Sequence, residues 1–235
     1  MPRVPALLIP PRTAVGLLAM QWSTGGWAYG TASLINNQHL VTCSHNLVDA
    51  ITNPPPRGYA VQVLFYPGYN QQRAANPPGG PSLPVRVGFF HHLYAAGNRE
   101  WDIAVCRLAA PIAPAPAAYF TPTLTTAAIV GSAVNLTGYP GPRNGEMWEE
   151  NDQVAGVHVP TNSLLYTHDT WPGNSGSPTW TYDAMTDTTR LHGVHVSRPG
   201  DLRRAVMMTA PIIAWINGAV AAPTPHAGGY QPVAR

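Results

Sequence analysis

Lysine is absent from the sequence, so its 13 basic residues are all arginine. Charged residues make up only 10% of the chain, and the formal net charge is +2. Proteins that bind nucleic acid or a membrane surface through charge concentrate their basic residues, whereas these arginines are scattered. We therefore expect neither nucleic acid nor a membrane as a partner.

The sequence also lacks a long uninterrupted apolar run. Its first residues are largely apolar, but Pro5, Pro10 and Pro11 interrupt them. A transmembrane helix needs about twenty consecutive apolar residues, and a signal peptide needs a continuous apolar segment. The sequence predicts neither. A cytoplasmic protein and a leaderless or mature secreted form are both left open.

Cysteine is scarce, with only Cys43 and Cys106. Two cysteines cannot form a disulfide framework, so we expect small buried residues, and whether the two pair is left open. The adjacent His91 and His92 are metal-ligating residue types, but no HExxH motif and no zinc-type Cys/His spacing accompany them. We expect no metal and no cofactor.

Proline and glycine are abundant, at 26 and 22 residues, and they separate short apolar, β-branched or aromatic runs. Many short strands between turn residues are typical of an all-β barrel or sandwich. A chain of 235 residues can form one large domain or two small barrels packed together. The predicted strands are 31–35, 39–43, 61–66, 85–90, 103–108, 133–139, 153–159, 163–167, 191–197 and 205–210.

Residues 109–118 read AAPIAPAPAA and divide these strands into two groups of similar number. Repeated prolines favour an extended connector over a strand or a helix. Near the end of the chain, Pro211 is followed by IIAWINGAV, with Gly218 toward the far end, which predicts a helix. We therefore predict two barrels, over residues 1–112 and 113–235, with a short helix at the end of the second.

Three residues with complementary chemistry lie beside predicted strands. His45 lies in VTCSHN, Asp102 begins the apolar part of EWDIAVCRL, and Ser175 lies in the turn-rich segment TWPGNSGSPTW. A serine hydroxyl is a poor nucleophile until a base takes its proton. An imidazole does this near neutral pH, and a carboxylate orients the imidazole. The order His, Asp, Ser therefore indicates nucleophilic catalysis.

The segments YGTASLI, LVTCSHN, WDIAVCRL, GNSGSP, LHGVHVS and APIIAWI follow one another along most of the chain. Together they resemble the chymotrypsin-fold serine proteases, in particular the bacterial glutamyl endopeptidase-like branch. The resemblance implies two six-stranded antiparallel β-barrels and a serine endopeptidase that acts on a protein or peptide substrate. It implies His45 as the general base, Asp102 as the group that orients it, and Ser175 as the nucleophile. We expect a monomer.

The resemblance also implies an oxyanion hole made by the backbone N–H groups of Gly173 and Ser175. Glycine suits position 173, because a residue without Cβ reaches backbone angles that aim an N–H inward. Asn174 stands where animal trypsin-like members carry an aspartate that pairs with a freed amino terminus. That activation switch is therefore not expected here.

Substrate recognition is implied at four positions. Thr170 and His195 stand where glutamyl endopeptidases bind a substrate carboxylate, and Arg198 would add a cation at the cleft edge. Asp169 stands where trypsin-type pockets place the acid that binds Lys or Arg. We favour a preference for glutamate before the cut, with an Arg/Lys preference through Asp169 as the alternative.

A second alternative is a catalytically silent protease fold that acts as a binding scaffold. Such proteins usually lose one member of the triad, and here all three residues are present.

The Arg203–Arg204 pair is interpreted as a solvated turn rather than a binding patch.

Overall fold

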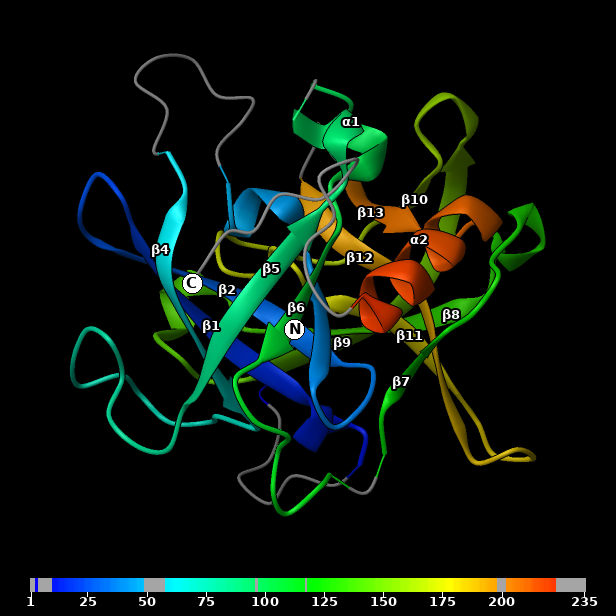
Figure 1. Cartoon of the computed structure of the whole chain (residues 1–235). Helices are drawn as coiled ribbons and strands as arrows, with labels where there is room; N and C mark the ends of the chain where they lie inside the picture. Colours follow the sequence, from blue (N-terminus) through cyan, green and yellow to red (C-terminus); the bar gives the residue numbers. More distant parts are fainter. Residues whose placement is uncertain are drawn as a thin grey trace.

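The chain folds into two β-barrels followed by a C-terminal helix, as the computed structural model in Figure 1 shows. The structure describes residue 3 and residues 10–48, 58–95, 97–116, 118–197 and 202–222. In Figure 1 the blue and cyan strands of the first barrel lie on the left, and the C-terminal helix, in red and orange, lies on the right. The predicted all-β fold class with one short C-terminal helix is confirmed.

The first barrel closes through antiparallel pairs in the order β1-β2-β3-β6-β5-β4. Its first strand reads VGLLAMQW and is buried along nearly all of its length, so apolar residues occupy both of its faces. The strands are β1 (Val15–Trp22), β2 (Trp27–Leu34), β3 (His39–Thr42), β4 (Ala60–Pro67), β5 (Leu83–Phe90) and β6 (Ala104–Leu108).

The second barrel has the order β11-β8-β9-β10-β13-β12, and an antiparallel pair between β11 and β12 closes it. A short seventh strand, β7, pairs in parallel with β12 on the outside of this ring. The strands are β7 (Phe120–Pro122), β8 (Ala133–Gly138), β9 (Trp148–His158), β10 (Ser163–Tyr166), β11 (Pro178–Asp183), β12 (Thr188–Ser197) and β13 (Arg203–Met207).

In the residues that the structure describes, two α-helices accompany the barrels: α1 (His92–Ala95), after β5, and α2 (Ala210–Ala221), after β13. Pro211 lies in the first turn of α2, where its missing N–H is not needed. The buried face of α2 includes Trp215 and Ile216, which join the core cluster that also fills the first barrel. Arg107 on β6 donates to the carbonyl of Ala222 at 3.3 Å. This hydrogen bond joins the residue after α2 to the first barrel.

The ten predicted strands overlap strands of the structure, whereas β1, β7 and β11 were not predicted. β1 has no apolar/polar alternation because it is buried on both faces. β11 begins with Pro178 directly after the turn-rich Ser175 segment, and β7 has only three residues. No strand lies in the described residues between β6 and β7, as predicted for the proline-rich connector. The exact division into two domains stays a prediction.

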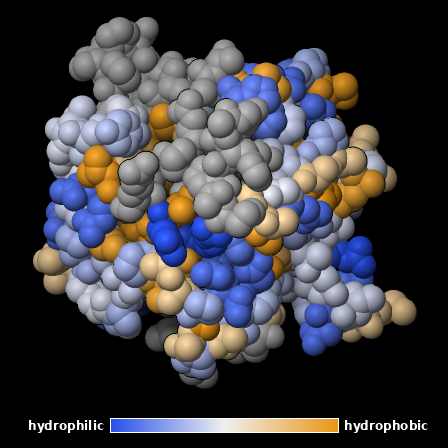
Figure 2. Space-filling view, viewed as in Figure 1, coloured by the Kyte–Doolittle hydropathy of each residue, from blue (hydrophilic) through white to orange (hydrophobic). Residues whose placement is uncertain are grey.

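The surface shows no continuous apolar face in the view of Figure 2, where hydrophobic residues form small groups among hydrophilic ones. The most exposed large hydrophobic residues are Met185, in the turn between β11 and β12, and Val159, in a short 3-10 helix after β9. In the described part of the chain, no helix is long and apolar enough to cross a membrane. Cys43 and Cys106 are both buried and both free.

Candidate active site

His45 lies in a short 3-10 turn, Ser44–Asn46, directly after β3. The Ser44 hydroxyl donates to the carbonyl of Ile103 at 2.8 Å, which anchors this turn to the residue before β6. Because β3 and β6 are paired, with Thr42 opposite Ala104, the end of one strand lies beside the start of the other. Asp102 precedes β6 and is thereby brought next to His45.

Asp102 holds His45 with both of its carboxylate oxygens. Oδ1 accepts the backbone N–H of His45 at 3.0 Å, and Oδ2 lies 2.8 Å from Nδ1 of the ring. The Asp102 side chain is only 8% exposed, whereas that of His45 is 32% exposed. A buried carboxylate bound in this way fixes the tautomer with hydrogen on Nδ1 and leaves Nε2 as the proton acceptor.

Ser175 lies in the loop between β10 and β11, and this loop has an unusual backbone. Gly173 has φ +102°, and a Cβ there would overlap the carbonyl oxygen of Tyr139. The Pro172 carbonyl accepts the N–H of Gly141 at 2.6 Å. Since the C=O and N–H of a trans peptide point in opposite directions, the Gly173 N–H is turned away from Gly141.

The loop's backbone donors divide into two groups. The N–H groups of Asn174, Gly176 and Ser177 donate to carbonyls of the protein at 2.8–3.0 Å. Those of Gly173 and Ser175 have no acceptor among the residues that the structure describes. Asn174 closes the loop internally, because its Oδ1 accepts the N–H of Trp171 at 3.1 Å. The two unused donors are the pair that the sequence predicted as an oxyanion hole.

The catalytic candidates meet between the barrels: His45 Nε2 lies 2.8 Å from Ser175 Oγ. Two residues that the sequence analysis did not single out position the serine. The Ser175 carbonyl accepts the N–H of Thr31 at 2.8 Å and the side-chain amide of Asn46 at 3.0 Å. A Cβ on Gly30 would overlap that amide group. The available signal was the position of Thr31 and Asn46 inside the motifs YGTASLI and LVTCSHN.

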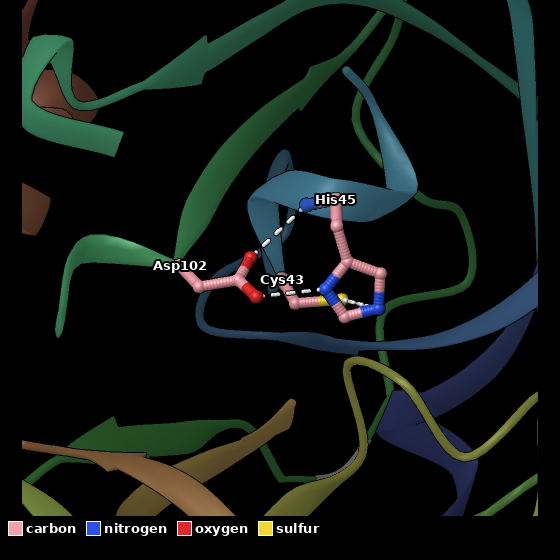
Figure 3. Close-up of side chains that lie close together, drawn as sticks. All are labelled: Cys43, His45 and Asp102. Atoms are coloured by element: carbon pink, nitrogen blue, oxygen red, sulfur yellow. Dashed lines mark hydrogen bonds and ion pairs between the residues drawn. The ribbon is translucent and has the colours of Figure 1, made fainter. Parts of the chain in front are cut away.

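A thiol also lies beside the base. Cys43 Sγ is 3.5 Å from His45 Nε2, and Figure 3 shows the Cys43 sulfur and the Asp102 carboxylate at different nitrogens of the ring. Single ligand atoms of Cys43, His45 and Asp102 lie within 4.8 Å of one another. Burial lowers the pKa of His45, but the charge of Asp102 and the thiol more than offset it and raise that pKa well above its usual value.

Comparison with known proteins identifies the family of the chain. The family profile described as a trypsin-like peptidase domain matches residues 30–184, the segment that holds His45, Asp102 and Ser175. The chain belongs to the trypsin-like peptidase family. The chymotrypsin-type fold and the peptidase family predicted from the sequence motifs are therefore confirmed.

A curated glutamyl endopeptidase from Bacillus licheniformis is 28% identical to this peptidase over 170 residues, 72% of this chain and 48% of the relative. The peptidase thus aligns with about half the length of that relative. A solved Glu endopeptidase in complex with MPD superimposes with TM-score 0.73 at 24% identity, over 91% of this chain and 93% of that one. Protease Anisep from Arthrobacter nicotinovorans gives TM-score 0.67 at 17% identity, over 91% and 98%.

The predicted recognition residues of the peptidase separate into two environments. Thr170 and His195 are buried, with 2% and 4% exposure, on the loop before Ser175 and on β12. Asp169 is exposed: its backbone N–H donates to Glu150 at 2.7 Å, and its carboxylate lies 3.4 Å from the Trp171 indole nitrogen. Arg198 lies outside the described residues.

The electrostatic environment of His195 is positive. Burial, followed by the charge of His45 and the nearby His168, Arg203 and Arg204, lowers the pKa of His195 to about 3. Its Nδ1 lies 2.7 Å from the hydroxyl of Tyr166. In the tautomer in which that hydroxyl donates to Nδ1, the ring hydrogen lies on Nε2. Arg203 lies opposite Tyr166 in the β10–β13 pair and is 6% exposed. The interpretation of Arg203–Arg204 as a solvated turn is therefore wrong, because the pair begins β13, where Arg203 is buried and Arg204 is half-buried.

Proposed function

We propose that this peptidase is a serine endopeptidase that uses His45, Asp102 and Ser175 as its catalytic triad. The observation that carries the proposal is the unbroken chain of contacts, 2.8 Å from Ser175 Oγ to His45 Nε2 and 2.8 Å from Nδ1 to Asp102. A hydroxyl, a base and an orienting carboxylate in hydrogen-bond reach are what acyl transfer through serine requires.

The reaction would follow two acyl-transfer steps. Ser175 Oγ attacks the scissile carbonyl carbon while its proton moves to His45 Nε2. The C–N bond then breaks, and His45 gives that proton to the leaving amine. Water next attacks the acyl-enzyme, its proton passes to Nε2, and the proton returns to Ser175 as the acid product leaves. Asp102 stays ionised throughout and stabilises the imidazolium that forms twice.

The two unused N–H groups of Gly173 and Ser175 support the proposal, because each tetrahedral intermediate carries a negative oxygen. Donors that are already oriented stabilise this charge without reorganisation during the reaction. The loop holds these two N–H groups in place because its other backbone N–H groups form hydrogen bonds to carbonyls of the protein. The hydrogen bond from Gly141 to the Pro172 carbonyl also fixes the plane of the Pro172–Gly173 peptide. The role of Pro172 is therefore to supply the carbonyl that fixes this peptide plane, which is compatible with catalysis.

We further propose that the peptidase prefers glutamate before the cut. Buried Thr170 and His195 provide a hydroxyl and an imidazole N–H, and the cations that lower the pKa of His195 would also attract a carboxylate. Of the two arginines among them, Arg203 is the buried one. The named specificity of the 28% identical relative agrees with this choice.

Two alternatives are less well supported. An Arg/Lys preference needs an ionised Asp169 inside the pocket, but Asp169 is exposed and faces the Trp171 indole. A silent scaffold needs a lost or displaced catalytic group, but the triad distances and the loop donors are those of a competent site.

Cleavage of a peptide library in which the residue before the cut varies tests the proposal. We expect cuts after glutamate in the wild-type protein, and a loss on the order of a million-fold in turnover for Ser175→Ala. Equal residual cleavage by wild type and Ser175→Ala would refute the triad. Cuts after Arg or Lys by wild type alone would keep the triad and refute the glutamate preference.

A further inference from the structure

The thiol of Cys43 takes no part in the proposed reaction, yet it contacts the catalytic base. Its Sγ lies 3.5 Å from His45 Nε2, the nitrogen that must accept the serine proton. Figure 3 shows the sulfur at this nitrogen, with Asp102 at the other. Cys43 itself is fully buried, but the His45 side chain is 32% exposed, so solvent reaches the imidazole.

The distance between sulfur and nitrogen suits a tetrahedral metal. Zinc binds cysteine sulfur at about 2.3 Å and histidine nitrogen at about 2.0–2.1 Å. At a tetrahedral angle these bond lengths place the two ligand atoms about 3.5 Å apart, which is the separation observed. Two ligands of the required types are thus already at the required spacing, without a change of backbone.

Asp102 completes the arrangement as an orienting group rather than a ligand. Its Oδ2 lies 2.8 Å from Nδ1, closer than the roughly 3.3 Å expected for nitrogen and oxygen ligands of one zinc ion. A carboxylate bound to the second nitrogen is the usual means of directing a metal-binding histidine. The same contact that prepares Nε2 to accept a proton therefore prepares it to bind a cation.

We propose that Cys43 Sγ and His45 Nε2 form a binding site for a soft divalent cation such as Zn²⁺, which reversibly inhibits the peptidase. On binding, Cys43 loses its proton to solvent, and the metal exchanges two waters for the sulfur and the nitrogen. Ser175 Oγ, 2.8 Å from Nε2, lies near enough to become a third ligand after a small movement. The lone pair that should take the serine proton is then occupied. Binding itself does not depend on the proposed function, whereas the inhibition does.

Titration with Cd²⁺ alone tests binding without reference to catalysis, because cadmium–thiolate bonds absorb in the ultraviolet. We expect one equivalent of Cd²⁺ to produce this absorption in wild type and in Ser175→Ala. Cys43→Ser, which keeps the side-chain size, should abolish it. Cys106→Ser is the matched control, since Cys106 is equally buried on β6, and it should retain the absorption.

Zn²⁺ inhibition of peptide cleavage provides the second measurement. Cys43→Ser should require at least about tenfold more Zn²⁺ than wild type for half-inhibition, measured against its own uninhibited rate. The site is refuted if wild type gives no charge-transfer absorption, if the absorption survives in Cys43→Ser, or if it disappears in Cys106→Ser. Equal Zn²⁺ sensitivity of wild type and Cys43→Ser would also refute it. A protein that binds Cd²⁺ through Cys43 but cleaves no peptide would instead refute the proposed function alone.

Discussion

The buried His195, in the predicted substrate pocket, should contribute to the loss of stability of this protein on acidification. His195 is 4% exposed, and burial together with neighbouring positive charges lowers its pKa from 6.5 to about 3. The unfolded chain therefore binds the proton first. The stabilisation is fully present above pH 6.5 and is lost as the pH falls from 6.5 toward 3. Between pH 7 and pH 4.5 the linkage from this group alone amounts to about 2.5 kcal/mol.

Thermal unfolding of wild type and His195→Asn at both pH values measures this contribution. Asparagine does not titrate, so the loss of stability on acidification should be about 2.5 kcal/mol smaller in the variant, roughly 5–10 °C in Tm for a chain of this size. His158→Asn is the control, because His158 is exposed and its replacement should leave the wild-type drop in place. Identical pH dependence of wild type and His195→Asn would refute the assignment of His195 as a buried neutral imidazole.

Three further predictions concern catalysis. Gly173→Ala should lower turnover by about 10²–10³-fold, because a Cβ at φ +102° overlaps the Tyr139 carbonyl and displaces one oxyanion donor; unchanged turnover with unchanged structure would contradict this. The acid limb of the pH–rate profile should have its midpoint above pH 6.5, because the raised pKa of His45 keeps this base protonated to higher pH. An acid limb with its midpoint at pH 4 would contradict this prediction. In a peptide-library profile, Arg203→Met should weaken cleavage after glutamate, whereas Asp169→Asn should leave it unchanged. Cleavage after Arg or Lys that Asp169→Asn abolishes and Arg203→Met leaves unchanged would favour the Arg/Lys alternative.

Most of the architecture could be predicted because local sequence patterns indicate its strands and its C-terminal helix. Short runs between turn residues located ten strands, and Pro211 located the start of α2. β1 was missed for a physical reason: a strand buried on both faces has no alternation to distinguish it. The parallel pairing of β7 with β12 joins residues about seventy positions apart, and no local signal encodes it.

The residues of the candidate site likewise divide into those that local motifs indicate and those that come together only in the folded protein. His45, Asp102 and Ser175 were recognisable because each stands in a motif of its own. The contacts of Thr31 and Asn46 with the Ser175 carbonyl arise only when the two barrels pack, so the sequence did not indicate them. The exposure of Asp169 and the burial of Arg203 likewise depend on neighbours from β9 and β10. These two nonlocal facts bear most directly on the choice between glutamate and arginine.

Labelling with a fluorophosphonate probe at neutral pH tests the central claim most directly. Attack by an activated serine forms an Oγ–phosphorus bond and expels fluoride, and mass spectrometry of the digested protein locates the adduct. The account predicts a single adduct on Ser175 in wild type, strong suppression in His45→Ala, and none in Ser175→Ala. A folded wild-type protein that remains unlabelled, or that carries the adduct on another residue, would contradict it.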